Sequence, residues 1–272
     1  MTIAAGRNLS ENDLSFYRDN GYLTLPDLLP PEKYDALRAH FDHMLADLPG
    51  GMRPEDMDVP HFTDPHLFDW LMDPGVLDLV QQLIGPDIAV FSSHFICKPA
   101  GDGKSVPWHD DAYYWREMIN PSAEAVTVWL ALDEVDEDNG CMKVIPGSHA
   151  PGERRYRPTR ASNSVFAEEL DPECVDDSRA VPIRLRRNEC SIHSAALVHG
   201  SDANRSDRRR AGFTMRYIST AVRFNHEEMG ERHQIFLARG QDRAGNVYAD
   251  PTVPHPELVA TRAAAQTHAD KR

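Results

Sequence analysis

The chain has 272 residues, of which 41% are hydrophobic and 26% are charged, so it can bury a sizeable globular core. Its formal net charge of −14 disfavours nucleic acid and anionic membrane surfaces as partners, because an acidic surface repels phosphate groups. The four cysteines form no C-x-x-C pair, the N-terminus lacks the pattern of a signal peptide, and no apolar run reaches membrane-spanning length. These features predict a cytoplasmic protein with reduced thiols.

The first third of the chain has helical patterning. Ser10 is a typical N-cap residue before an acidic turn, and the helix that it opens is expected to end at Gly21. A short strand is expected over residues 22–25, and residues 49–60 predict a loop because they are rich in Gly, Pro and acids. Helical segments are expected over residues 10–20, 31–47 and 74–84.

From Ile88 onward, short runs rich in β-branched and aromatic residues alternate with turn residues. The runs are AVFSSHFICK, AVTVWLALDEV, CMKVIPGS, AVPIRL, ECSIHSAALVH and AGFTMRYIS. This density predicts a sandwich or barrel, and a last helix is expected over residues 255–265. We expect one domain over residues 1–272, with helical elements in about 10–85, a β core in about 86–222 and a C-terminal segment in about 223–272.

The segment Trp108-His109-Asp110-Asp111 carries a candidate metal site. In a strand, residues i and i+2 lie on the same face, so His109 and Asp111 are expected to reach one metal ion together. His199, at the end of the expected strand 194–198, is the candidate third ligand. Two histidines and one carboxylate on one face of an octahedral metal are typical of non-haem iron oxygenases. The pair alone is also compatible with an ordinary polar turn.

A basic stretch follows His199 and adds a second feature. Arg210 is expected at the start of an apolar strand, where a guanidinium could bind a carboxylate through two parallel hydrogen bonds. A metal-chelating 2-oxo acid with a second carboxylate requires such a partner. The other three arginines, Arg205, Arg208 and Arg209, are expected to form a solvated turn.

Three segments together resemble the phytanoyl-CoA dioxygenase family. They are WHDD with AYYW, VWLALDEVDEDNGCMKVIPGSH and HGSDANRSDRRRAGFTMRYI, and their order, spacing and PGSH hairpin match over residues 10–250. The resemblance implies a mainly β fold with flanking helices and a double-stranded β-helix core, the jelly-roll or cupin-like arrangement. It also implies Fe(II), with 2-oxoglutarate and dioxygen as co-substrates.

The resemblance also assigns roles to individual residues. It implies iron ligands at His109, Asp111 and His199, and contacts to 2-oxoglutarate at Arg210, Ser201, Trp129 and His94. For His94, a buried histidine that bonds to the backbone is an equal alternative, and Lys98 is a weaker candidate of the same kind. His149 is expected to be a turn residue and His193 a packing residue.

The implied reaction is hydroxylation of a substrate C–H bond, with release of succinate and CO2. Halogenation would require a small residue in place of Asp111, so hydroxylation is favoured over it. A non-catalytic metal or small-molecule binding protein, desaturation and ring closure remain alternatives, whereas a zinc hydrolase would not need Arg210.

The expected substrate is a small polar molecule or a natural-product intermediate. An acyl-CoA substrate would need a basic patch for its phosphates, and the chain is strongly acidic. Substrate contacts are expected in residues 50–64 and 221–241, and no oligomeric state is predicted. Candidate substrate-binding side chains are Tyr113, Trp115, Arg216 and Arg223.

Overall fold

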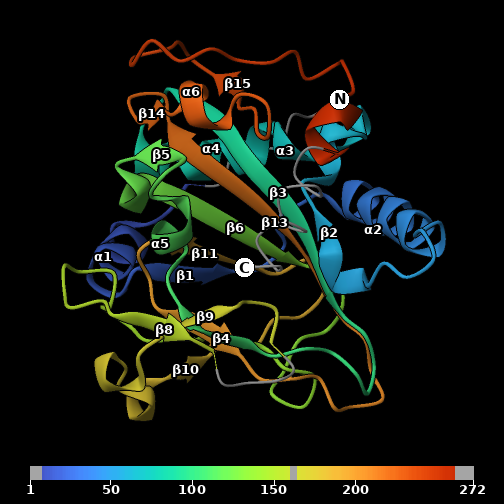
Figure 1. Cartoon of the computed structure of the whole chain (residues 1–272), viewed down its shortest axis with the longest axis vertical. Coiled ribbons are helices and arrows are strands. Elements are labelled where there is room, and N and C mark those ends of the chain that lie inside the picture. The colour runs from blue at the N-terminus through green and yellow to red at the C-terminus, as the bar shows by residue number, and fades with distance from the viewer. Residues whose placement is uncertain (1–7, 160–163, 261–272) are drawn as a thin grey trace.

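The computed structural model describes residues 8–159 and 164–260. Two antiparallel sheets form its centre, and the larger one crosses the upper part of the view in Figure 1. In order across that sheet, the strands are β1 (Tyr22–Leu25), β11 (Cys190–Ser194), β6 (Ala125–Ala131), β13 (Arg210–Ser219), β3 (Ile88–Lys98) and β15 (Phe236–Arg239). A further short strand, β2 (Met57–Asp58), also pairs with β3.

The smaller sheet lies below the larger one in Figure 1. Its strands, in order, are β10 (Val181–Pro182), β7 (Met142–Val144), β12 (His199–Ser201) and β4 (Val106–His109). The remaining strands form two antiparallel pairs. In one, β14 (Arg223–Phe224) pairs with β5 (Ile119–Asn120), and in the other, β8 (Tyr156–Pro158) pairs with β9 (Glu168–Leu170). Two stacked antiparallel sheets are the arrangement expected for a double-stranded β-helix.

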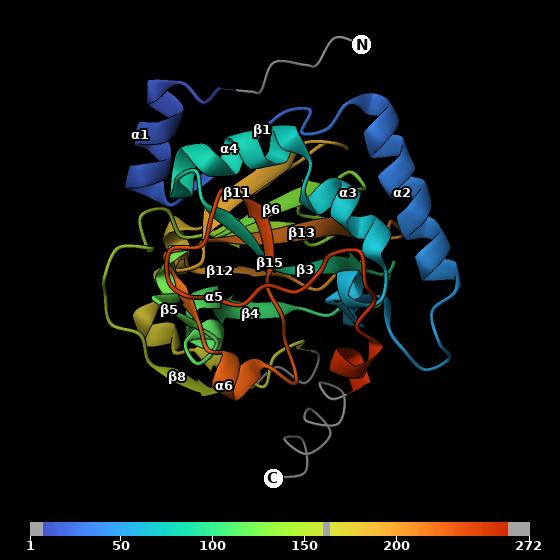
Figure 2. The ribbon, with the colours of Figure 1, turned by 90° about the horizontal axis from the view of Figure 1, so that it is seen from above.

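Helices cover one face of the larger sheet, as Figure 2 shows from above. These helices are α1 (Glu11–Asn20), α2 (Pro31–Ala46), α3 (Phe68–Leu71) and α4 (Pro74–Ile84). The short helices α5 (Asp111–Trp115) and α6 (His226–Met229) lie elsewhere in the chain. None of the helices in the described ranges is long and apolar enough to cross a membrane.

Strand alternation divides the larger sheet into an apolar face and a polar face. On β13, Phe213 packs toward the helices, where its ring stacks on Phe95 at 4.4 Å and Phe95 lies 4.9 Å from Phe41 of α2. The alternating neighbours Arg210 and Thr214 lie on the opposite face and line a cavity between the sheets. The apolar core therefore holds the sheet rigid while its other face carries polar side chains.

The ends of α1 agree with the sequence prediction. Ser10 and Asp13 form a capping box, in which the Ser10 hydroxyl accepts the Asp13 N–H and the Asp13 carboxylate accepts the Ser10 N–H. Gly21 ends the helix with φ of 81°, in the left-handed region that glycine adopts readily.

The structure differs from the prediction in the segment 49–60. It contains a 3-10 turn over Pro54–Asp56 and then β2, which pairs with β3. A two-residue strand is too short to produce an alternating pattern, so the sequence reads as a loop. The prediction also omitted α3. Of the helix expected over 255–265, residues 256–260 are helical and the rest lies outside the described residues.

Candidate active site

The three predicted metal ligands come together between the sheets. His109 is the last residue of β4, Asp111 is the first residue of α5, and His199 is the first residue of β12. The strands β4 and β12 are neighbours, and His109 and His199 lie directly opposite each other. One ligand atom from each of the three residues lies within 4.8 Å of the others, and all three side chains are buried.

The route by which these residues meet differs from the prediction in two respects. Asp111 does not continue the strand, because β4 ends at His109 and the Asp110 carboxylate caps α5 by accepting the Tyr113 N–H at 2.9 Å. His199 likewise begins a strand, because a turn separates it from β11. The orientation of Asp111 is therefore set by the start of a helix, which strand alternation cannot reveal.

Both histidines are oriented by their own backbone. The Nδ1 of His109 donates to the Pro107 carbonyl at 2.8 Å, and that of His199 donates to the Leu197 carbonyl at 2.9 Å. These bonds leave each Nε2 free to bind a metal ion. Burial, followed by the neighbouring His109, holds the pKa of His199 well below its usual range, so the ring is neutral and its lone pair is available.

The surroundings of Asp111 favour its ionised carboxylate. Burial alone would raise the pKa of its carboxyl, but the rings of His109 and His193 and the positive charge of Arg216 hold it well below the usual range. Its Oδ1 lies 3.7 Å from His109 Nε2, and its Oδ2 lies 3.9 Å from His193 Nε2. Two imidazoles and one carboxylate suit a divalent transition metal.

Arg210 lies at the far end of the same cavity. Its guanidinium lies 4.9 Å from the centre of the Trp129 ring, and its buried Nε and Nη1 atoms have no hydrogen-bond partner. Burial lowers the pKa of Arg210 to about 10, so the group stays charged at neutral pH. A buried cation of this kind needs an anionic partner, because an unsatisfied charged donor is costly.

Lys98 and Ser201 lie beside Arg210. Lys98 is the cross-strand partner of Arg210, and its Nζ donates to the Ser201 hydroxyl at 2.7 Å and to the Asp202 carbonyl. Burial, followed by the charge of Arg210, lowers the pKa of Lys98 to about 6. Arg210, Lys98 and Ser201 thus lie together at one end of the cavity.

Two of the other three arginines of the basic stretch, Arg208 and Arg209, form ion pairs, whereas Arg205 is exposed as predicted. Arg208 contacts both carboxylate oxygens of Asp136, at 2.8 and 2.9 Å. Arg209 forms two hydrogen bonds with Asp133, at 2.8 and 3.0 Å. Sequence reasoning missed these pairs because their acidic partners lie far away in the chain, in the turn between β6 and β7.

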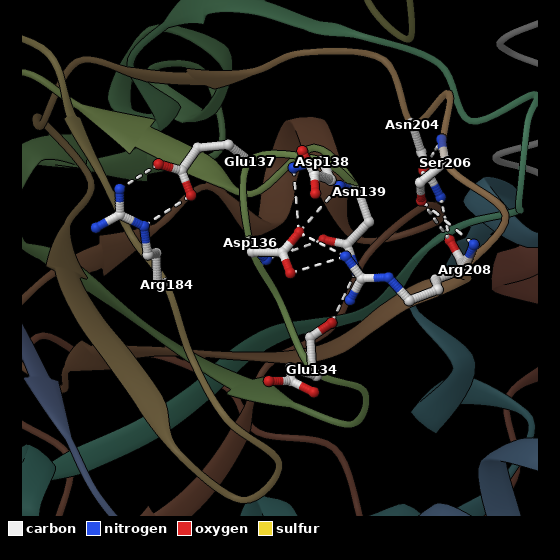
Figure 3. A network of polar contacts seen from close by, with 9 residues as sticks. All are labelled: Glu134, Asp136, Glu137, Asp138, Asn139, Arg184, Asn204, Ser206 and Arg208. Atoms are coloured by element: carbon white, nitrogen blue, oxygen red, sulfur yellow. Dashed lines mark hydrogen bonds and ion pairs between the residues drawn. The ribbon is translucent and has the colours of Figure 1, made fainter.

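Figure 3 shows the network that joins the β12–β13 connection to that turn. Asp136 contacts Arg208 and also accepts the Asn139 N–H, although at a longer 3.3 Å. Asn204 donates to the Arg208 carbonyl at 2.7 Å and accepts from the Ser206 N–H and hydroxyl. These bonds fix the segment that separates His199 from Arg210.

One cavity of about 730 Å3 joins the metal-ligand cluster to the cationic end. All seven predicted site residues line it, namely His94, His109, Asp111, Trp129, His199, Ser201 and Arg210. His94 Nε2 also bonds to the Glu55 carbonyl at 2.9 Å, which fits the alternative of a histidine bonded to the backbone, and its contact with 2-oxoglutarate stays a prediction.

The structure divides the predicted substrate-binding side chains. Trp115 and Arg216 line the cavity, whereas Tyr113 stacks on Tyr156 at 3.4 Å and Arg223 lines a separate cavity at the surface. Tyr113 and Arg223 therefore do not line the cavity that holds the metal-ligand cluster, and neither is proposed as a substrate-binding residue.

His193 was expected to be a packing residue, but it lines the cavity. The side chain is 2% exposed, and neither ring nitrogen has a hydrogen-bond partner. The alternation of β11, in which His193 and Ser191 share the face opposite Ile192, is the sequence signal for this position. His149 bonds to the Arg18 carbonyl at 3.0 Å, as suits a turn residue.

Comparison with known proteins identifies relatives of the same architecture. The profile of the phytanoyl-CoA dioxygenase family matches residues 17–212. This chain belongs to the phytanoyl-CoA dioxygenase family. It is 24% identical over 243 residues to the peroxisomal phytanoyl-CoA dioxygenase of Rattus norvegicus, which covers 79% of this chain and 70% of the relative.

Other members of the comparison are oxygenases with different names. Ectoine dioxygenase of Bordetella bronchiseptica is 29% identical over 153 residues, which cover 52% of this chain and 50% of that protein. The non-heme monooxygenase ThoJ superposes with a TM-score of 0.70 and 25% identity, over 93% of this chain and 94% of ThoJ. EctD from S. alaskensis, solved with 2-oxoglutarate and 5-hydroxyectoine, gives a TM-score of 0.66 at 21% identity, over 80% of this chain and 78% of EctD.

Membership of the phytanoyl-CoA dioxygenase family confirms three sequence predictions. The chain is an enzyme of the non-haem iron, 2-oxoglutarate-dependent oxygenase class. Its cofactors are iron and 2-oxoglutarate. The mainly β, jelly-roll fold with flanking helices is confirmed as well.

Proposed function

We propose that this protein is a dioxygenase that hydroxylates a C–H bond of a small organic molecule and converts 2-oxoglutarate to succinate and CO2. One observation carries the proposal. The buried cluster of His109, Asp111 and His199 shares a cavity with the unpaired guanidinium of Arg210. A metal-chelating acid with a second carboxylate is the ligand that such a cavity complements.

The residues present fit both cofactors. His109, Asp111 and His199 would hold iron, because their free Nε2 atoms and carboxylate suit Fe(II) and fill one face of an octahedral ion. Arg210 would hold the far carboxylate of 2-oxoglutarate, with Ser201 and Lys98 beside it. Trp129 would support the Arg210 guanidinium through its ring face.

The bound iron and 2-oxoglutarate would supply the oxidising chemistry, in which one oxygen atom of dioxygen enters succinate and the other enters the substrate. The protein would position the co-substrate and the substrate and would limit their contact with water. The apolar core behind the larger sheet supports Arg210 and Trp129 on paired strands, and the cavity would limit access of water once the substrate is bound.

Asp111 favours hydroxylation over halogenation. His109, His199 and Asp111 would hold the iron together with a bidentate 2-oxo acid, and with Asp111 as a ligand the site would offer no place to a halide beside dioxygen. Desaturation or ring closure is the second candidate outcome, because it uses the same cofactors and differs only in the fate of the substrate.

The test is turnover of the Fe(II)-loaded full chain with 2-oxoglutarate, isotopically labelled dioxygen and chloride buffer, against a library of small polar metabolites. We expect substrate-stimulated succinate and a product that gains one labelled oxygen. A chlorinated product would contradict the role of Asp111, and a dehydrogenated product would replace hydroxylation with the second outcome. Absence of 2-oxoglutarate turnover and of metal-dependent 2-oxoglutarate binding would overturn the proposal as a whole.

A further inference from the structure

A second set of polar groups without partners lies in the cavity, at the end away from Arg210. Arg216, Thr127 and His193 are cross-strand neighbours on β13, β6 and β11, and form one row across the larger sheet. We call Arg216, Thr127 and His193 the distal row. All three line the cavity.

Each member of the distal row has a buried polar atom without a hydrogen-bond partner. These atoms are the Nε of Arg216, the Oγ1 of Thr127 and both ring nitrogens of His193. Thr127 is 1% exposed and His193 is 2% exposed, so bulk water does not satisfy them. Buried polar groups are normally paired, and three adjacent exceptions that face one cavity indicate the position of a ligand.

The distal row carries the positive charge of Arg216. No carboxylate of the described residues forms an ion pair with Arg216, and its guanidinium lies 5.3 Å from the centre of the Trp115 ring. The charge of Arg216 acts on Asp111, whose carboxylate the metal ion would engage. An arginine in this setting favours a carboxylate, because its planar donors match the two oxygens.

The distal row is too far from Arg210 to serve the same molecule of 2-oxoglutarate. Arg210 and Arg216 lie on one face of β13, and five intervening residues place them roughly 20 Å apart at about 3.3 Å per residue. Lys98 and Ser201 lie at the Arg210 end, whereas Asp111 lies 3.9 Å from His193 at the distal end. The metal-ligand cluster therefore lies between the Arg210 end of the cavity and the distal row.

We infer that the distal row binds a carboxylate of the primary substrate, so that the enzyme acts on an organic acid whose reacting C–H bond lies near the metal-ligand cluster. This inference rests on the proposed function and names its substrate class. Arg216 would hold the carboxylate, and Thr127 and His193 would donate to it. Phe91, Trp115 and Met118 line the same region, and they would contact an apolar or aromatic body.

The test compares organic acids with their uncharged analogues. Benzoate, phenylacetate, 3-phenylpropanoate and hexanoate, each beside its primary amide, are titrated by ligand-observed NMR. The protein is the full chain loaded with 2-oxoglutarate and with Zn(II) as a redox-inert substitute for iron. We expect at least one acid to bind roughly 10-fold to 100-fold more tightly than its amide, the range for a hydrogen-bonded charged pair.

Substitutions then locate the preference for acids. Arg216→Met should reduce the acid-to-amide ratio to within about 3-fold, which is under 1 kcal/mol at 1.4 kcal/mol per decade. Thr127→Val should weaken acid binding and leave the charge in place, and it serves as the second variant if Arg216→Met does not fold. Arg223→Met is the matched control, because Arg223 is exposed and lines a different cavity.

The outcomes separate this inference from the proposed function. 2-Oxoglutarate affinity is measured in the same samples and should not change in Arg216→Met. Equal binding of acids and amides to the unmodified protein would overturn the inference, as would an equal loss in Arg223→Met. If 2-oxoglutarate fails to bind while acids still prefer the distal row, the proposed function is wrong but the carboxylate site stands.

Discussion

His109 and His199 share a local device that orients them toward a metal ion. Each ring donates its Nδ1 proton to the carbonyl of the residue two positions earlier, so the tautomer and the ring direction are set before any ion binds. Both residues lie on paired strands, which keeps their Nε2 atoms close to the carboxylate of Asp111. The site is therefore preorganised by backbone contacts.

We expect the substitution of any one ligand, His109→Ala, Asp111→Ala or His199→Ala, to abolish Fe(II)-dependent succinate formation. Loss of one of three protein ligands removes a direct metal bond, so metal affinity should fall by more than the roughly 10–100-fold seen for supporting residues. Metal titration followed by calorimetry measures this. His43→Ala, in an exposed histidine, is the control, and full activity in His199→Ala would contradict the assignment.

Arg210→Met should raise the 2-oxoglutarate dissociation constant by roughly 10-fold to 150-fold, because a charged hydrogen-bonded pair is worth about 1.5–3 kcal/mol. Iron affinity should change little, since Arg210 lies at the other end of the cavity. Arg205→Ala, in an exposed residue of the same connection, is a suitable control. An unchanged constant in Arg210→Met would assign the carboxylate to another cation.

We expect the Lys98 amine to take up a proton when 2-oxoglutarate binds. Burial and the charge of Arg210 lower its pKa to about 6, so at pH 7.5 it is mostly neutral, and an arriving carboxylate favours its charged form. The binding enthalpy should therefore differ between buffers of different ionisation enthalpy, and Lys98→Met should remove the difference. Equal enthalpies in all buffers for the unmodified protein would contradict this role.

The lowered pKa of Lys98 also makes the free energy of unfolding depend on pH. The unfolded lysine has a pKa near 10.4, so between about pH 6 and pH 10 the unfolded chain binds more protons at this residue than the folded chain. The contribution of Lys98 to the free energy of unfolding therefore increases as the pH rises through this range.

At the scale of elements, the connection between β12 and β13 matters because it carries His199 at one end and Arg210 at the other. Asn204 is fully buried within it, and its side chain bonds to the carbonyls of Pro99 and Arg208 and to both donors of Ser206. Arg208 adds an ion pair with Asp136 at the surface (Figure 3).

Asn204→Ala should lower the free energy of unfolding by about 2–4 kcal/mol, because several buried backbone groups would lose their partners. Arg208→Ala should cost no more than about 1 kcal/mol, since its ion pair with Asp136 is partly exposed to solvent. Urea unfolding of the two variants measures the difference. Equal losses would contradict the larger contribution of the buried amide to this connection.

The helices and strands differ in how well the sequence predicted them. Helices with caps and strands with clear alternation, such as α1 and β13, were predicted close to their observed bounds. The short elements β2 and α3 were not, because two to four residues carry no measurable period. The metal ligands and Arg210 were found through motif and resemblance, whereas Thr127 and His193 became visible only when strand pairing placed them beside Arg216.

At the scale of the whole molecule, an acidic protein places basic side chains in a cavity that carboxylates, among them Glu55, Asp58 and Asp111, also line. The formal net charge is −14, yet Lys98, Arg210 and Arg216 all line the one cavity that contains the metal-ligand cluster. Anions would be excluded from most of the surface and stabilised inside, which favours small acids over large polyanions such as nucleic acid. The helices on the outer face of the larger sheet keep these cations on a rigid support (Figure 2).

The central claim is that one cavity binds iron through His109, Asp111 and His199 and binds 2-oxoglutarate between that iron and Arg210. The most direct measurement is an anaerobic calorimetric titration of 2-oxoglutarate into the full chain, with and without Fe(II). We predict binding that requires Fe(II) and is weakened separately by Asp111→Ala and by Arg210→Met. Equal affinity with and without Fe(II), or affinity that neither variant changes, would contradict the account.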